Sequence, residues 1–558
     1  MPIVLDASAI AAGLTRLAPE QLRSALASYL PQGATTEEKI IALETGLRSP
    51  LGQSIRDAMA RWIVDEVVPV TRLVPQAYSN WRPPVRDSMM FVVARLSPAR
   101  LAPKLLEQIE LPLNTPPEVR LLLLIAKVPG LQKLGQVIAR NRHLHPALRR
   151  ALAKLENGIH DVEPEEIRAI VLQTLGSRAK TFEVQVSTRI LKEASVSAVV
   201  RFSWKNPATG RRERGVFKVL KPHIPEYFAE DMNYLQGLAQ HFGDRHHTYG
   251  FPAHLIPDTF RKVQRLLRHE VNFRREQKTL REAAALYRSH ASVRIPRVIQ
   301  PLCTGTMTAL SEERGIKVTN AAARLSPGAR RKVAEHLVEA LIAVPLLSAL
   351  PEAVFHGDPH AGNLLYHRRT GKLVILDWAL REKLGREQRR HLALLFLMVT
   401  LRDPPGVFNE IIALAQHRPR ADSSVACRTR QAIGKFLDEM PTTSMPSAAD
   451  AMRLLESVAM QGVKFPASLI MLSKVMFTLE GILGDLVGSD MAMGLTVARH
   501  VALHWLAHRS EFRSPLVRRD WITLQCSALL LVSRLGIQWQ QTMLNRWLKP
   551  DPAAAAAS

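Results

Sequence analysis

The sequence predicts an α+β fold in two lobes, with helical extensions at both ends. Three observations support this class. A cluster of β-rich segments lies between residues 182 and 220, long helical patterns flank it, and an apolar segment near residue 377 ends in an acid. The length of 558 residues exceeds one ordinary domain and favours a core with helical additions.

The N-terminal part is predicted to be helical. Residues 19–30 and 36–48 carry apolar side chains at helical spacing between Pro and Gly turns, and residues 164–175 repeat this pattern. We therefore expect a helical N-terminal region over 1–115, without recognisable chemistry, and a helical extension over 116–180.

A first lobe is predicted over residues 181–315. Three segments rich in Val and aromatic residues are expected to form a small antiparallel sheet. These segments are 182–190, 196–204 and 213–220. The turn residues Asn-Pro-Ala-Thr-Gly at 206–210 separate the last two of them. A long helical stretch over about 254–289 follows, and short strands are expected at 293–299 and 305–311.

The second lobe is predicted over residues 316–400. The chain there is mostly helical and is interrupted by a buried strand at 373–377 that ends in Asp377. A C-terminal helical part is expected over 401–549, and the low-complexity segment 550–558 is expected to be disordered.

The charge balance favours anionic partners. The chain has 75 Lys and Arg residues against 50 Asp and Glu residues, a formal net charge of +25. Such a balance suits nucleic acid, phosphorylated ligands or an anionic membrane surface. No recognised nucleic-acid motif accompanies the charge, so a nucleic-acid binder ranks last among these classes.

The cysteines and the apolar segments indicate a cytoplasmic protein. The three cysteines show no metal-ligand or redox spacing, so neither a disulfide scaffold nor a zinc ribbon is expected. The N-terminus lacks the pattern of a signal peptide. The apolar stretches 391–401 and 521–533 are too short to span a bilayer, and we expect membrane contact to be peripheral at most.

The strongest chemical signal is the segment His-Gly-Asp-Pro-His-Ala-Gly-Asn at 356–363. Asp358 and Asn363 have the separation of the Asp and Asn in a protein-kinase catalytic loop. There the Asp orients the attacking hydroxyl and the Asn holds one Mg²⁺. Asp377 follows an apolar strand, as does the kinase acid that binds Mg²⁺ at the ATP phosphates. The order of elements and these residues together predict a two-lobed protein-kinase-like fold that binds ATP and Mg²⁺.

Lys218 is the predicted ligand of the ATP α- and β-phosphates. It lies on a predicted strand whose same face carries Val216 and Leu220, so its ammonium needs an anion. Glu276 is its predicted partner, because it shares one helical face with Phe273 and Leu280.

The chain has no P-loop signature and no G-x-G-x-x-G segment before Lys218. Small residues stand there instead, and Ala194, Ser195 and Ser197 would let the backbone approach the phosphates.

These motifs resemble the UbiB/AarF family of atypical kinases, which is linked to ubiquinone and other prenyl-quinone metabolism. The resemblance covers residues 130–490. Its segments are K-L-G-Q at 133–136, A-S-V-S-A-V at 194–199, K-V-L-K-P at 218–222, the helix from Glu270 to Glu276, H-G-D-P-H-A-G-N at 356–363 and L-E-G at 479–481.

The resemblance implies roles for further residues. Lys133 and Gln136 would lie on a helix that crosses the protein-substrate groove, and Lys133 would pair with Glu270. This regulatory arrangement would suppress protein phosphorylation and leave ATP binding with slow ATPase activity. The client would be a quinone precursor, another lipid-like molecule or a biosynthetic complex, met in the cytoplasm or at the inner face of the membrane.

The chain departs from the family pattern in three places. Ser197 and Ala198 replace a Gly-Gln pair, Asn272 replaces an Asp, and Trp378-Ala379 follows the metal-binding Asp377 in place of Phe-Gly. These changes keep two alternatives open. One is a pseudokinase scaffold that binds a lipid or protein partner. The other is a phosphotransferase of the aminoglycoside or choline kinase type, which shares the 356–363 pattern.

Overall fold

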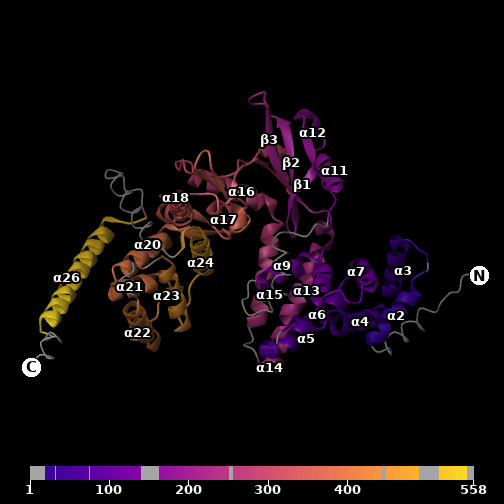
Figure 1. The fold of residues 1–558 in the computed structure, drawn as a ribbon, viewed down its shortest axis with the longest axis horizontal. Coiled ribbons are helices and arrows are strands. Elements are labelled where there is room, and N and C mark those ends of the chain that lie inside the picture. Colours follow the sequence, from indigo (N-terminus) through magenta and orange to yellow (C-terminus); the bar gives the residue numbers. More distant parts are fainter. Residues whose placement is uncertain are drawn as a thin grey trace, which may run out of the picture. The chain divides into compact units, whose positions relative to one another are not determined.

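The computed structural model describes two compact units (Figure 1). The first contains residues 1–273 and 299–310, and the second contains residues 274–298 and 311–558. Within these units the described residues are 19–31, 33–74, 76–139, 162–250, 255–420, 422–440, 446, 448–488 and 515–548. The tail 550–558, expected to be disordered, lies outside this range.

The first unit begins with helices, as the sequence predicts. They are α2 (Pro19–Tyr29), α3 (Thr36–Arg48), α4 (Gly52–Trp62), α5 (Val70–Leu73), α6 (Arg82–Arg95), α7 (Pro98–Glu110), α8 (Pro117–Ile125), α9 (Pro129–Ala139), α11 (Pro164–Leu175) and α12 (Ser177–Thr181). Local signals set several starts: Thr35 and Glu38 form a capping box before α3, and prolines occupy the first turns of α6, α7, α8 and α11. The apolar faces of α2 to α9 contribute to one core.

A four-stranded sheet in the order β1-β2-β3-β5 follows these helices. Its strands are β1 (Gln185–Glu193), β2 (Ser197–Lys205), β3 (Arg212–Leu220) and β5 (Met307–Ser311). The β2–β3 hairpin is antiparallel and its turn is closed by Asn206, whose side chain accepts from Ala208 N at 3.0 Å. The expected antiparallel sheet is present, and its first strand lies three residues further along the chain than predicted.

The helical stretch predicted over 254–289 is two helices, α15 (Leu255–Glu270) and α16 (Phe273–Leu286). They separate at Val271 and Asn272, two residue types of modest helix propensity. A further helix, α13 (His223–Asp244), was not predicted, and short α14 (His246–Tyr249) follows it. Within the first unit, α13 packs against α15, α9 and α6.

The second unit holds more β-structure than the sequence predicts. One small sheet has the order β4-β9-β8-β6, and β10 pairs with β7. These strands are β4 (Val293–Arg294), β6 (Ile316–Lys317), β7 (Glu352–His356), β8 (Leu364–His367), β9 (Lys372–Ile375) and β10 (Arg381–Gly385). The prediction of a single strand there is wrong, because β7, β8 and β10 are too short for an alternating pattern to stand out.

Helices make up the rest of the second unit. They are α17 (Val318–Ala322), α18 (Pro327–Val338), α19 (Val344–Leu347), α20 (Arg386–Thr400), α21 (Pro404–Leu414), α22 (Ser424–Glu439), α23 (Ala448–Met460), α24 (Ala467–Val487) and α26 (Arg518–Leu548). Helix α24 packs against α18, α23, α17 and β10.

In the described part of the chain, α24 alone is long and apolar enough to cross a membrane. Only the length and the composition of α24 indicate a membrane span, and a buried core helix of a globular unit can have the same length and composition. Its contacts with α18 and α23 and its buried face, which includes Leu472 and Met476, are those of such a core helix. The stretch 391–401 lies in α20 and its C-terminal cap, and the stretch 521–533 lies in α26.

Candidate nucleotide site

The catalytic-loop segment of the second unit lies between β7 and β8. β7 ends at His356, a short 3₁₀ turn spans Ala361–Asn363, and β8 begins at Leu364. Asn363 is buried, and its Nδ2 donates to Asp358 O at 3.3 Å. This bond directs the amide nitrogen into the loop and leaves the amide oxygen as the ligand that Mg²⁺ prefers. Asp358 and Asn363 are therefore brought together, as their spacing requires.

His356 is the internal support of this loop. Its Nδ1 accepts from Asp358 N at 3.2 Å, so its Nε2 carries the proton and donates to Leu376 O at 2.9 Å. The ring is buried and lies edge-on to Trp378, with 4.9 Å between ring centres. One neutral imidazole thus joins the loop that carries Asp358 to the segment that carries Asp377.

Lowering the pH should destabilise the protein through His356. Burial lowers its pKa below the ordinary 6.5, although Asp377 and Asp358 act in the opposite direction. Below pH 6.5 the unfolded chain binds a proton that the folded chain does not, so the free energy of unfolding falls until the pH reaches the folded pKa. The slope in that window is at most about 1.4 kcal/mol per pH unit. Urea unfolding at pH 7.5 and 5.5 measures it.

His356→Gln should flatten this pH dependence, because Gln keeps an amide donor and acceptor and does not titrate. Part of the slope will remain, since burial also lowers the pKa of His241. Equal slopes in the wild type and the variant would contradict a neutral, buried His356.

Asp377 differs from the sequence prediction in one respect. The strand β9 ends at Ile375, and Asp377 lies two residues later with an exposed side chain and a φ of +52°. The prediction of a buried strand that reaches Asp377 is therefore wrong at its last two residues. A left-handed backbone is uncommon for a residue other than Gly and is enriched at functional sites. Asp377 is thus placed as an accessible carboxylate on a constrained turn.

Trp378 accounts for that constraint. It is fully buried, its Nε1 donates to Ile375 O at 3.2 Å, and its ring lies 6.2 Å from Tyr287. Ala379 N donates to Asp377 Oδ1 at 3.4 Å. The Trp-Ala pair that replaces the usual Phe-Gly therefore fastens the turn after Asp377 to the core.

Lys474 is a site residue that the sequence reasoning missed. It lies on α24, and its Nζ is 3.1 Å from Asp358 Oδ1, across 116 positions of sequence. The signal for it was a solitary basic residue in the strongly apolar run 467–479, where a charge is costly without a partner. Close by on α24, Glu480 pairs with Arg453 of α23 at 2.6 Å.

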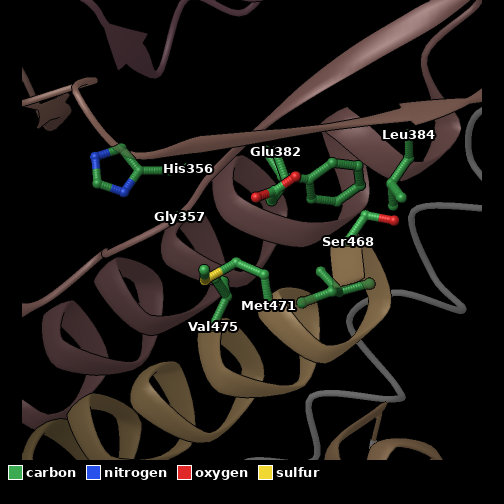
Figure 2. Close-up of a pocket in the computed structure, with 9 residues that line it drawn as sticks. His356, Gly357, Glu382, Leu384, Ser468, Met471 and Val475 are labelled. Carbon is green, nitrogen blue, oxygen red and sulfur yellow. The ribbon is translucent and has the colours of Figure 1, made fainter. Parts of the chain in front are cut away.

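A small hollow with about 190 Å³ of empty space lies where β7, β10 and α24 meet. Figure 2 shows residues of β7 and β10 along one side of it and Ser468, Met471 and Val475 of α24 along the other. This space includes open solvent and encloses no room for even a water molecule, so the hollow is not a nucleotide site by itself.

In the first unit, Lys218 lies on β3 where the predicted alternation places it. Phe217 and Val219 are fully buried, and Lys218 is on the less buried face with its Nζ 5.8 Å from the centre of the Phe273 ring. Such a contact favours the ammonium form and holds the side chain against an apolar surface. Lys218 is therefore an oriented cation on the sheet.

The segment of small residues before β2 is tied to the K-x-G-Q helix. Lys133 of α9 pairs with Glu270 Oε1 at the end of α15, and Ser195 Oγ donates to Glu270 Oε2 at 3.2 Å. The implied ion pair of Lys133 with Glu270 is therefore present, and Ser195 is an additional partner. The side chain of Gln136 lies outside the described residues, and the regulatory role of the pair stays a prediction.

The predicted site residues are divided between the two units. Lys133, Ala194, Ser195, Ser197, Lys218 and Glu270 belong to the first, and Glu276, Asp358, Asn363 and Asp377 belong to the second. Glu276 is buried on α16 beside Phe273 and Leu280, as its spacing predicts. The pairing of Lys218 with Glu276 remains a prediction.

The residues of the second unit fit Mg²⁺ held jointly with phosphate. No group of three His, Cys, Asp or Glu side chains in the described ranges could hold a metal ion without further ligands. Mg²⁺ is ordinarily bound by one or two protein oxygens together with water and substrate phosphates. Asn363 and Asp377 supply such a partial set, whereas a structural metal would need a fuller one.

Comparisons with known proteins agree with the motifs. Residues 154–410 match the ABC1 atypical kinase-like domain family. The "Probable protein kinase UbiB" of Pasteurella multocida is 25 % identical over 280 residues, which are 49 % of this chain and 52 % of that protein. The protein of the same name from Xanthomonas oryzae pv. oryzae is 23 % identical over 367 residues, 63 % of this chain and 64 % of that protein. The chain thus spans about half to two thirds of the length of these relatives.

A solved structure of Rv3197 from Mycobacterium tuberculosis, in complex with erythromycin, is 16 % identical and covers 67 % of this chain and 90 % of that one. Its TM-score of 0.45 is too low to support an argument. The family match and the two lobes of strands and helices confirm an α+β kinase-like fold with helices before and after it. Residues 154–410 therefore match the ABC1 atypical kinase-like domain, and the chain is distantly similar to the UbiB proteins.

Proposed function

We propose that this protein binds Mg-ATP and acts as a slow ATPase or a small-molecule kinase. The main support for the proposal is the ordered loop at 356–363. In this loop neutral His356 and buried Asn363 both form hydrogen bonds with the backbone of Asp358. A loop that only turns the chain would not need a buried imidazole and a buried amide to set the position of one carboxylate.

Each polar residue then has a role in phosphoryl transfer. Lys218, supported by Glu276, binds the α- and β-phosphates, and Asn363 and Asp377 hold Mg²⁺. When bound, the metal neutralises charge on the phosphates. Asp358 orients the attacking water or hydroxyl and takes its proton. The small residues Ala194, Ser195 and Ser197 cover the phosphates in place of glycines.

Thermal unfolding with Mg-ATP tests this proposal. The wild type should be stabilised, by about 2.7 kcal/mol when the ligand is at one hundred times its dissociation constant. Asp377→Asn should lose the part of the stabilisation that depends on Mg²⁺, because it removes a carboxylate ligand of the metal. Absence of stabilisation in the wild type, or equal stabilisation of the variant, would remove the proposal.

A pseudokinase scaffold is the first alternative. Buried Trp378 favours it, because the turn after Asp377 is fastened where kinases carry a flexible glycine. ATP turnover that is measurable in the wild type and absent from Asp358→Asn would exclude it. The second alternative, an aminoglycoside or choline kinase, requires phosphorylation of one of those small molecules.

Contact with an anionic membrane surface is the further part of the proposal. The helix α26 carries exposed apolar side chains along most of its length, which are Ile522, Leu529, Leu530, Val532, Ile537, Trp539 and Leu544. Its basic residues outnumber its one acid, Asp520, which is bound to Arg390 of α20 at 2.6 Å. An apolar, basic helix suits the interface of an anionic bilayer. The protein would then act in the cytoplasm, at the inner face of the membrane.

Vesicle flotation tests the membrane contact. Wild type should float with vesicles that contain anionic lipid and should not float with neutral vesicles. Leu529→Gln with Trp539→Gln should abolish flotation, while Arg48→Gln on α3 serves as an exposed control. ATPase assays with those vesicles and with phenolic quinone precursors test whether the client is lipid-like. Unchanged turnover in every mixture would refute a lipid or quinone client.

A further inference from the structure

A fully buried ion pair lies beneath the segment of small residues that joins β1 to β2. Lys221 Nζ and Glu193 Oε2 are 3.1 Å apart, and their side chains are 0 % and 2 % exposed. Glu193 is the last residue of β1, and Lys221 directly follows β3. The pair therefore joins the two strands that flank β2, at the end of the sheet where residues 194–196 lie.

The backbone around the pair closes the same turn. Ala194 N donates to Ser197 O at 2.8 Å, and Lys221 N donates to Val196 O at 3.0 Å. Residues 194–196 are thus fixed by two contacts outside the turn. One is the hydrogen bond from Lys221 N to Val196 O, and the other is the hydrogen bond from Ser195 Oγ to Glu270. Every one of these contacts lies within the first unit.

Stability alone is a poor reason for such a pair. Removing two charges from water costs several kcal/mol each, and a well-packed apolar pair of similar size is often equally stable or more so. An ion pair instead restricts the relative position of two side chains, because an ammonium and a carboxylate interact well only in a narrow range of distances and angles. Two apolar side chains can pack in several arrangements. The pair lies beside a turn in which Val196 alone contributes a large apolar side chain to the core, so a fixed geometry from the ion pair is useful there.

We propose that Glu193 and Lys221 are positioning residues that set the conformation of residues 194–197 for nucleotide phosphates. The inference rests on the proposed function, in which this segment covers the phosphates. Without the pair the segment would sample several conformations. If it held the binding geometry about a tenth of the time, the apparent dissociation constant for ATP would rise about tenfold.

The test replaces the pair by apolar residues of similar size, Glu193→Leu with Lys221→Met. Net charge does not change, so long-range attraction of ATP is kept. The matched control is Glu183→Leu with Lys205→Met, an exposed pair with 2.9 Å between Nζ and Oε1 that joins the turn before β1 to the end of β2. Hydrogen exchange of the amides at 194–197 is measured without nucleotide, and binding of a fluorescent ATP analogue with Mg²⁺ is measured by titration.

The expected result is a double variant that unfolds at or near the temperature of the wild type, exchanges faster at 194–197 and binds the analogue about tenfold more weakly. The control should match the wild type in all three. Unchanged exchange and unchanged affinity in the double variant would overturn the inference. If the wild type binds no nucleotide, the proposed function fails separately, and the exchange measurement still decides whether the pair orders the turn. If the double variant is unfolded, Glu193→Gln, which keeps the size and a hydrogen-bond acceptor, is measured in the same way.

Discussion

Asp358→Asn should lower ATP turnover about 10²- to 10⁴-fold, the usual loss when a positioned general base is removed. The loop should keep its shape, since His356 and Asn363 bond to the backbone of Asp358 and not to its carboxylate. The variant should therefore bind Mg-ATP with nearly the affinity of the wild type and lose the chemical step. Steady-state release of phosphate and titration with a fluorescent analogue measure the two effects separately.

Lys474→Met supplies the companion measurement. Its ammonium lies 3.1 Å from the Asp358 carboxylate and offsets part of the repulsion between that carboxylate and a phosphate. We expect both weaker nucleotide binding and slower turnover, with Asp358→Asn the more severe in turnover. Wild-type turnover in Asp358→Asn would show that the loop is not catalytic. A gain in activity in Lys474→Met would show that the lysine restrains the carboxylate and does not assist it.

Arg389→Met should destabilise the second unit by roughly 2–5 kcal/mol, because it removes a buried guanidinium that donates to three carbonyl groups. Arg389 is fully buried on α20, and its guanidinium donates to Pro345 O at 3.4 Å, to Ser348 O at 2.5 Å and to Leu350 O. Pro345 lies in α19 and Ser348 and Leu350 follow it, so the side chain supplies donors to carbonyls at the end of this helix and just beyond it. Urea unfolding, followed by tryptophan fluorescence, measures the loss.

Arg386→Met on the first turn of α20 is the control for this prediction. Arg386 is exposed, and surface substitutions ordinarily change stability by less than about 0.5 kcal/mol. Met retains much of the volume of Arg, so a large difference between the two variants isolates the buried hydrogen bonds. Equal effects would mean that Arg389 acts only by packing.

The candidate site shows which features local sequence encodes. Asp358 and Asn363 are five positions apart in the sequence. A segment this short that turns back on itself keeps its two ends close, so the two residues share one loop. Alternation along β3 placed Lys218 on the less buried face, and the helical period placed Glu276 among buried neighbours. These are short-range geometric rules, so they held without knowledge of the rest of the chain.

Long-range contacts account for what was missed. Lys474 meets Asp358 across 116 positions, and Glu193 meets Lys221 only because β1 and β3 flank the same strand. Asp377 was expected to be buried because an apolar run precedes it, yet Trp378 occupies the core and turns the carboxylate outward. The short strands β7 and β10 exist because they pair with each other, and their own residues give little sign of it.

The sequence by itself determined the similarity to the ABC1 atypical kinase-like domain and the residues that share the loop at 356–363, because these depend on short motifs. It also determined the α+β class, which follows from the order of the helical and strand patterns. Only the tertiary structure decided which polar side chains meet: Lys474 with Asp358, Lys221 with Glu193, and Ser195 with Glu270. The physical reason is that a buried or half-buried charge takes whatever partner the folded chain brings within about 4 Å, and that distance is independent of separation in sequence.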